Sequence, residues 1–388
     1  MIFDRPSAKK FEDLSIDGFE SPVANAAEIG KTFFQLIDGT DSVRVVRYAG
    51  SKSSVSVPGC ITVGKKPYSV TEIGGSAFKG CAGISEISMP DTVESIGDSA
   101  VEGCAGLSEV HIPKGIKNIR GRAFSGCTGL KRVVMKDSPD AIGRSSFEGC
   151  SSLKAFCIEK GEGRFTSDSQ GLMYNGDGSV LIRAPFALEG TADIPPGVKE
   201  IADGAFSGCS GVTSVRISAS VRSIGDNVFS GCSRLALLYV DPRNSRYRSD
   251  LQGILYDSEV TKVIKAPNSI VGVLEIPDTV VSVCTSAFEG CTGLVSIAIP
   301  ESTIEIGDSA FEGCSKVRSI SISNGVVRIG NDAFRNCSAI ISVTIPDSVE
   351  VIGDRAFHGC SRLNSVSIPL GARVGEQAFP ANSDIVME

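Results

Sequence analysis

The sequence lacks tryptophan and contains only two histidines, His111 and His358, among its 388 residues. Histidine is the side chain most often used for general acid–base catalysis and for activating a serine or cysteine nucleophile. Because these two histidines are far apart in the chain, no nucleophile–base pair is evident. We therefore expect a protein that is not an enzyme and that needs no cofactor.

Long basic runs and long apolar runs are missing as well. No Lys/Arg run exceeds two residues and the net charge is −7, which argues against a nucleic-acid partner. No apolar run approaches the roughly 18–20 residues that span a bilayer, so we expect no membrane insertion. The first ten residues lack the apolar core of a signal peptide. This start is compatible with a cytoplasmic chain or with a chain whose targeting segments have been removed.

A regular series of cysteines is what the sequence does contain. Within three groups, successive cysteines stand 23 residues apart, and each of the two gaps between the groups measures 59 residues. The in-phase cysteines are Cys81, Cys104, Cys127, Cys150, Cys209, Cys232, Cys291, Cys314, Cys337 and Cys360. Apolar positions keep the same phase, so the chain is predicted to be a stack of 23-residue repeats with two longer units.

Each repeat divides into a strand and a turn. The pattern Leu-x-x-Val-x-Ile-Pro, as at 363–369, predicts a short strand with two inward apolar residues. The pattern Asp/Ser-x-Ala-Phe-x-Gly-Cys predicts a helical or 3₁₀ turn, with Asp or Ser as N-cap and Gly as left-handed C-cap. The predicted fold class is therefore an α/β-type repeat solenoid, a curved right-handed superhelix with a parallel sheet on its concave face and helical turns on its convex face.

The cysteines are expected to be buried free thiols. In-phase side chains on a stack point the same way, whereas a disulfide needs converging Cβ vectors. A zinc site would need short paired spacings such as Cys-x₂-Cys, and none occurs, so no metal site is predicted. Cys60, Cys157 and Cys284 are out of phase. Cys157 follows an inward phenylalanine and is predicted to be the most accessible thiol.

The two longer units each contain a predicted β-hairpin. The first runs from 171 to 185 around the turn Asn175–Gly178, and the second runs from 253 to 267. The Asn-Gly-Asp-Gly turn is similar to the start of a calcium loop, but the later ligands of such a loop are missing. Turn chemistry is therefore the favoured interpretation.

Two domains are predicted. Residues 1–62 form an N-terminal segment and capping β region, and residues 63–388 form the solenoid, with hairpin-bearing long repeats at about 159–195 and 241–277. In the cap, residues 1 to about 20 are expected to be irregular and 24–37 to include a short helix. The strands expected in the cap are Thr32–Leu36, Val43–Tyr48 and Ser54–Ile61. A cap is physically expected because an open solenoid end exposes unpaired edges and apolar core.

The repeat unit Ile-Gly-Asp-Ser-Ala-Phe-Glu-Gly-Cys-Ser-x-Leu-x-x-Ile-x-Ile-Pro resembles the BspA-like leucine-rich repeat of bacterial and protozoal surface proteins. The resemblance covers nearly everything from about 32 to 380. It implies adhesion at the cell surface, or binding to host matrix proteins and to other cells. It therefore also implies a cell-surface or secreted location.

Candidate binding residues follow from the strand phase, which identifies the side chains that point out of the concave sheet. The last four repeats offer only Ser, Thr and Ala at these positions, whereas the central repeats offer arginine, tyrosine and apolar side chains, which are frequent in interface hot spots. The predicted ligand-binding residues are Arg132, Val134, Arg216, Leu237 and Tyr239.

The predicted function is that of a non-catalytic module that binds a protein or glycoprotein partner through its concave face. An intracellular interaction scaffold is the alternative, because unpaired cysteines and the absent signal segment also suit a reducing compartment. The sequence does not indicate the identity of the partner or the oligomeric state.

Overall fold

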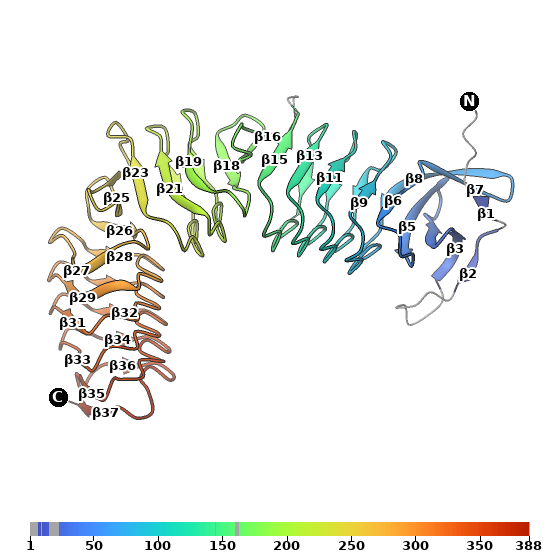
Figure 1. Ribbon diagram of the computed structural model, residues 1–388. Coiled ribbons are helices and arrows are strands. Elements are labelled where there is room, and N and C mark those ends of the chain that lie inside the picture. Colours follow the sequence, from blue (N-terminus) through green and yellow to red (C-terminus); the bar gives the residue numbers. More distant parts are fainter. Residues whose placement is uncertain (1–6, 9, 15–22, 144, 160–162, 388) are drawn as a thin grey trace. The chain divides into compact units, whose positions relative to one another are not determined.

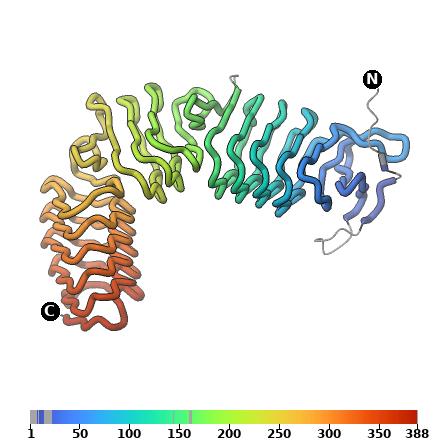
Figure 2. The backbone as a smooth tube through the Cα atoms, in the orientation of Figure 1, coloured from blue at the N-terminus to red at the C-terminus, as the bar shows by residue number. Residues whose placement is uncertain are grey.

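The computed structural model describes residues 7–8, 10–14, 23–143, 145–159 and 163–387. These residues form 37 β-strands joined by turns, and none of them is helical. Accordingly, the described part contains no helix with the length and hydropathy needed to cross a membrane. The chain divides into two compact units, Met1–Ala187 (unit 1) and Leu188–Glu388 (unit 2). Each unit contains a series of coils of similar outline (Figure 2).

Unit 1 begins with a β region. Its strands are β1 (Ser7–Ala8), β2 (Glu12–Leu14), β3 (Val23–Ile29), β4 (Thr32–Leu36), β5 (Ser42–Tyr48), β6 (Ser54–Ser56), β7 (Cys60–Val63) and β8 (Lys66–Ile73). Strands β2 to β5 follow one another antiparallel, and β5 then pairs in parallel with β8. The predicted strands at 32–36 and 43–48 are confirmed, and the one at 54–61 is divided into β6 and β7. The predicted domain boundary lies within β7, which pairs antiparallel with β8.

The short helix expected over residues 24–37 is wrong. Gly30 and Lys31 have φ angles of 60° and 67°, and they form a two-residue reversal between β3 and β4. Pairing of β4 with β5 then completes a sheet, which outweighs the weak helical preference of the alanines in β3. Of the segment from 1 to about 20, the structure describes β1 and β2, and most of the remainder lies outside the described residues.

The coils of unit 1 carry long strands on one side and short strands on the other (Figure 1). The long strands are β9 (Glu86–Ser88), β11 (Glu109–Ile112), β13 (Arg132–Met135) and β15 (Ala155–Ile158), and the short ones are β10 (Ser95–Ile96), β12 (Asn118–Ile119) and β14 (Ala141–Ile142). Strands β11, β13 and β15 form a parallel sheet and β9 pairs with β6, whereas β10, β12 and β14 extend the sheet of β8 in parallel. The register places Val110 beside Val133 and Ile96 beside Ile119. Side chains alternate along the long strands, so Val110 is buried and His111 is exposed.

Unit 2 repeats this arrangement (Figure 1). Its long strands are β19 (Gly190–Asp193), β21 (Val212–Ile217), β23 (Leu237–Val240), β27 (Val271–Glu275), β29 (Gly293–Ile299), β31 (Ser319–Ile322), β33 (Ser342–Thr344), β35 (Ser365–Ile368) and β37 (Asp384–Met387). Its short strands are β20 (Glu200–Ile201), β22 (Ser223–Ile224), β28 (Ser282–Val283), β30 (Glu305–Ile306), β32 (Arg328–Ile329), β34 (Val351–Ile352) and β36 (Arg373–Val374).

The helical turns predicted between the two sheets are wrong, and the α/β description fails with them. Ser309 and Gly313 have φ angles of 52° and 74°. A left-handed residue interrupts helical hydrogen bonding, so the segment forms separate turns, as in the bonds from Glu312 N to Ser309 O and from Cys314 N to Phe311 O, and no helix propagates. The predicted left-handed glycine is confirmed at Gly313 and at the same position in most coils.

The turns are held by the neighbouring coil instead. Phe311 N donates to Ala333 O at 2.7 Å, and Ser309 N donates to Asn331 O at 2.8 Å. Asp308, at a position that was predicted to be an N-cap, also joins two coils, because its Oδ1 accepts the N–H of Asn331 in the following coil. The fold is therefore an all-β solenoid of stacked coils.

The two predicted hairpins are confirmed. In unit 1, β16 (Phe165–Ser167), β17 (Met173–Asn175) and β18 (Val180–Arg183) are antiparallel, and in unit 2 β24 (Tyr247–Ser249), β25 (Leu255–Asp257) and β26 (Lys262–Lys265) match them. Equivalent tyrosine–aspartate hydrogen bonds stabilise both loops. Tyr174 donates its hydroxyl proton to Asp168 at 2.8 Å, and Tyr256 donates to Asp250 at 3.1 Å. The Asn175 side chain accepts Val180 N–H, as expected for turn chemistry.

The core consists of ladders that run along each stack. In unit 2, Phe288, Phe311, Phe334, Phe357 and Phe379 stack with ring centroids 4.9–5.3 Å apart. A parallel ladder of free thiols lies beside them. Cys314, Cys337 and Cys360 donate from Sγ to the phenylalanine carbonyl of the preceding coil, as when Cys337 donates to Phe311 O at 3.2 Å, and Cys291 donates to Pro267 O. The predicted ladder of free thiols is thus confirmed.

Truncation of one ladder phenylalanine tests this account of the core. Phe311 is fully buried between two stacked rings, so Phe311→Ala should cost about 3–5 kcal/mol in the free energy of unfolding. Urea denaturation of the two proteins measures this difference, and Phe311→Leu should cost clearly less. A loss below about 1 kcal/mol for the alanine variant would show that the ring contributes little to packing.

Candidate functional site

The outward side of the long strands, here called the long-strand face, carries all five predicted binding residues. In unit 1, Arg132 lies in register between Glu109 and Ala155, and Val134 lies between His111 and Cys157. In unit 2, Arg216 lies beside Tyr239, and Leu237 lies beside Ser214. The five residues thus form two groups, one in each unit.

The unit 1 group is a network of paired polar side chains. Glu109 Oε1 lies 2.7 Å from His111 Nε2, and Glu109 Oε2 lies 3.5 Å from Arg132 Nη1. Arg132 Nη2 also donates to Cys157 Sγ at 3.5 Å. Val134 lies among these groups and is half-buried. Because Arg132 is already paired on both sides, it is a well-oriented cation, although such exposed pairs stabilise the fold by at most about 1 kcal/mol.

The unit 2 group combines a cation with exposed apolar surface. Leu237 and Tyr239 are 40% and 45% exposed, which is unusual for large side chains in the middle of a stack. Arg216 Nη1 lies 3.3 Å from Asp193 Oδ1 in the adjacent strand. An arginine, a tyrosine and a leucine therefore stand together on two neighbouring strands.

The second hairpin unit adds apolar side chains that the sequence analysis missed. Leu251, in the loop before β25, is fully exposed, and Val271 and Val273 on β27 are 72% and 62% exposed. The loop packs closely on β23, since a Cβ on Gly253 would lie 3.0 Å from Leu237 Cδ1. Val273 could have been found from its phase, because it stands 36 residues after Leu237.

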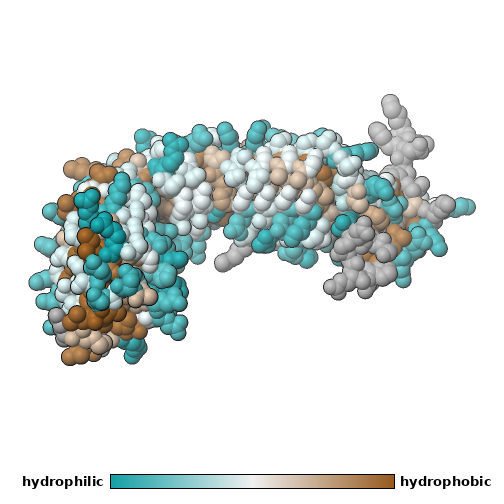
Figure 3. Space-filling view, turned by 60° about the horizontal axis from the view of Figure 1, so that its bottom comes forward, coloured by the Kyte–Doolittle hydropathy of each residue, from teal (hydrophilic) through white to brown (hydrophobic). Residues whose placement is uncertain are grey.

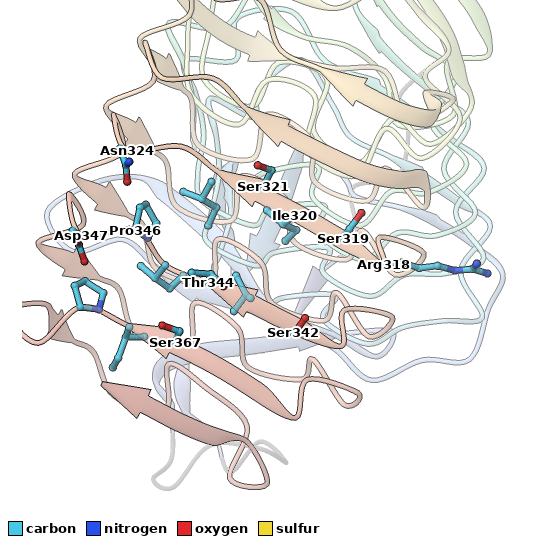
Figure 4. Close-up of a pocket in the computed structure, with 15 residues that line it drawn as sticks. Arg318, Ser319, Ile320, Ser321, Asn324, Ser342, Thr344, Pro346, Asp347 and Ser367 are labelled. Atoms are coloured by element: carbon cyan, nitrogen blue, oxygen red, sulfur yellow. The ribbon is translucent and has the colours of Figure 1, made fainter. Parts of the chain in front are cut away.

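A groove of about 520 Å³ opens farther along the long-strand face of unit 2. It lies where the pairing of successive long strands is interrupted. Strand β31 pairs with β29 and β33 pairs with β35, but β31 and β33 are not paired with each other. Its floor carries the hydroxyls of Ser319, Ser321, Ser342, Thr344 and Ser367 (Figure 4). The sequence predicts only Ser, Thr and Ala side chains at these positions and does not reveal the interruption.

The last coil of unit 2 exposes apolar side chains. Ile385, Val386 and Met387 on β37 are about half exposed, and Leu370 is 73% exposed. Figure 3 shows hydrophobic surface at this end of unit 2. Among the described strands, β37 pairs with β35 alone.

Metal chemistry has no evident location in the part of the chain that the structure describes. No group of three or more His, Cys, Asp or Glu side chains there could hold a metal ion. Burial raises the pKa of the ladder thiols of Cys104, Cys127, Cys150, Cys291 and Cys360 to about 12, so they remain protonated and unreactive at neutral pH. Cys157 is half-buried on the long-strand face.

Comparison with protein families identifies the repeat. A family model described as "BspA type Leucine rich repeat region (6 copies)" matches residues 61–169, 190–263 and 267–386. The chain belongs to the BspA-type leucine-rich repeat family. A comparison with curated proteins found no match.

Solved structures of bacterial repeat proteins share this fold. A leucine-rich cell surface protein from Faecalibacterium prausnitzii is 23% identical, with a TM-score of 0.59 over 92% of this chain and 95% of that chain. The pneumococcal vaccine antigen PcpA is 18% identical, with a TM-score of 0.54 over 93% of each chain. At these identities the likeness concerns the fold of stacked coils.

Alkylation distinguishes the Cys157 thiol from the buried thiols of the ladder. In native protein at about pH 8, iodoacetamide should label Cys157 rapidly. Ladder thiols such as Cys337, whose pKa is raised well above its ordinary value by the neighbouring Cys314 thiol and by burial, should react only after unfolding. Peptide mass spectrometry measures each site, with protein unfolded in urea as the control. Equal native labelling of Cys337 and Cys157 would contradict the assignment of the ladder to the core.

Proposed function

We propose that this chain is a non-catalytic binding module of a cell-surface or secreted protein, and that it binds a protein or glycoprotein of a host or of another cell through the long-strand face. The observation that carries the proposal is the exposed group of Arg216, Leu237 and Tyr239 on adjacent strands of unit 2. Arginine and tyrosine are over-represented among residues that dominate binding energy.

The surface around this group supports the proposal. Leu251, in the loop that packs on β23, and Val271 and Val273 on β27 add exposed apolar side chains in the adjoining hairpin unit, and exposed apolar surface on soluble proteins commonly marks interaction sites. The ion pair of Arg216 with Asp193 is exposed, so exchanging it for a pair with a partner costs little. Tyr239 offers a rigid amphipathic surface that loses little entropy on binding.

A structural relative supports the location. The Faecalibacterium prausnitzii protein that shares the fold is described as a leucine-rich cell surface protein. An adhesion role for the present chain rests on that likeness together with the exposed group on the long-strand face. Concavity of this face, expected from the sequence, would add contact area for a rounded partner.

An intracellular interaction scaffold is the second candidate. It is favoured by the thirteen free cysteines, since unpaired thiols are commoner in reducing compartments. A full-length gene that encodes an upstream signal segment would favour the surface role, and partner capture from cytoplasmic extract alone would favour the scaffold.

Affinity capture with matched variants tests the site. The intact chain, immobilised as bait, should capture a partner from extracellular-matrix and cell-surface extracts, and the triple variant Arg132→Ala, Arg216→Ala, Tyr239→Ala should lose it. Each of these truncations is expected to cost about 1–2 kcal/mol of binding free energy if it removes a hot-spot contact. Partner proteins are identified and quantified by mass spectrometry.

The control variant carries Ser319→Ala, Ser342→Ala and Ser365→Ala, which change the same face at exposed small residues. It should capture as much partner as the unmodified chain. Unchanged capture by the Arg132/Arg216/Tyr239 variant would show that these residues do not form the binding site. If folded bait captures nothing from these extracts, the search would move to cytoplasmic extract.

A further inference from the structure

A second cavity lies away from the long-strand face. In unit 2, a cleft of about 510 Å³ is bounded by the turn after β22 on one side and by β26 and the turn after β28 on the other. Its lining includes Asp226, Asn227, Tyr247 and Lys265. This volume is in the range of about 300–1,000 Å³ that is usual for small-molecule sites.

The cleft exists because the hairpin unit replaces a complete turn. Ala266 N donates to Ala287 O at 2.7 Å, which is the bond that Phe288 N makes to Ala310 O one coil later. Ala266 therefore has the position in its coil that Phe288 has in the next coil, and Lys265 has the position of Ala287. One ring of the phenylalanine ladder is missing here, and a lysine is buried where an alanine normally lies.

The missing turn also leaves hydrogen-bond groups without partners. In the preceding coil, Phe206 N donates to Val228 O at 3.0 Å and Gly204 N donates to Asp226 O at 2.9 Å. Among the described residues, the equivalent N–H groups of Asn227 and Phe229 have no acceptor. Both residues line the cleft.

Lys265 adds charged donors to this set. It is 7% exposed, and Nζ donates to Ser286 O at 2.7 Å, its one hydrogen bond within the described structure. An ammonium has three donors, so two are unused. Burial lowers the pKa of Lys265 although the negative charge of Glu289 acts in the opposite direction, so the protein compensates the buried charge only in part.

Acceptors face the cleft from its rim. Asp203 Oδ1 and Asp308 Oδ1 each accept an N–H from the following coil, at 2.9 and 2.8 Å. Asp226 has the same position in its own coil, but among the described residues no N–H donates to its carboxylate. Tyr247 accepts from Ile224 N with its hydroxyl oxygen at 3.1 Å, so its proton is available to a ligand.

We propose that this cleft binds a small hydroxylated carboxylate of the size of a monosaccharide acid. The ligand's carboxylate accepts from Lys265 Nζ and from the Phe229 N–H, and its hydroxyls donate to the Asp226 carboxylate. The rim carboxylate disfavours a ligand that carries only negative charge, whereas hydroxyl donors suit it. This inference is independent of the protein-binding role of the long-strand face.

Calorimetric titration of the full chain with glucuronate, glucose and acetate tests the proposal. Glucuronate should bind, while glucose, which lacks the carboxylate, and acetate, which lacks the hydroxyls, should each bind at least about tenfold more weakly. Absence of glucuronate binding to the folded chain, or equal binding of glucuronate and glucose, would overturn the proposal.

Two variants test whether the ligand binds in the cleft. Lys265→Met keeps the aliphatic stem and should reduce glucuronate affinity at least about tenfold. The control Lys262→Met, at an exposed position on the same strand, should bind as the unmodified chain does. Ala266→Phe restores the missing ring and should also abolish binding, with an unchanged or higher thermal midpoint. Undiminished binding by folded Lys265→Met or by folded Ala266→Phe would show that the ligand does not occupy the cleft.

Discussion

Hydrogen bonding from each coil to the next is the interaction on which the rest of this structure depends. The bonds from Phe311 N to Ala333 O, from the Cys337 thiol to Phe311 O and from Asn331 N to the Asp308 carboxylate all join successive coils. No coil can bury its apolar face or satisfy its turn alone. Stacking at a 23-residue step pairs the strands, as in the pairing of Ile297 with Ile320. The same step provides hydrogen-bond partners for the turns and aligns the side chains of the core ladders.

The strands and the core could be predicted from the sequence because they follow local periodicity. Alternation in period two placed Val110 inward and His111 outward, and the in-phase cysteines indicated free thiols. The turns could not be predicted in the same way, because Asp, Ser and Gly suit a helix cap as well as a left-handed turn. The interaction that decides between them is the intercoil bond, which no single repeat reveals. The same reasoning explains the error at 24–37, where pairing with β5 determines the structure.

The candidate sites were predictable to different degrees. Register and phase alone place Arg216 and Tyr239 on one face. The apolar contribution of Leu251 depends on how the hairpin loop packs on β23, and the hydroxyl groove depends on an interruption between β31 and β33. Neither is visible in the repeat phase, because both are departures from it. Irregular coils therefore carry most of the surface that distinguishes one part of the array from another.

The two hairpin units show what such a departure can produce. Arg183 and Lys265 stand 82 residues apart at equivalent positions before Ala-Pro. Arg183 is half-exposed, and its guanidinium lies 4.3 Å from the Phe186 ring centroid, an arrangement that keeps its charge close to water. Lys265 is buried instead, at a cost that a methionine or leucine of similar volume would avoid. Packing alone does not call for an ammonium at this position. Within the described structure, Phe229 N–H has no acceptor and no N–H donates to the Asp226 carboxylate, and both residues line the same cleft as Lys265. Ligand binding is therefore the simplest physical reason for the lysine.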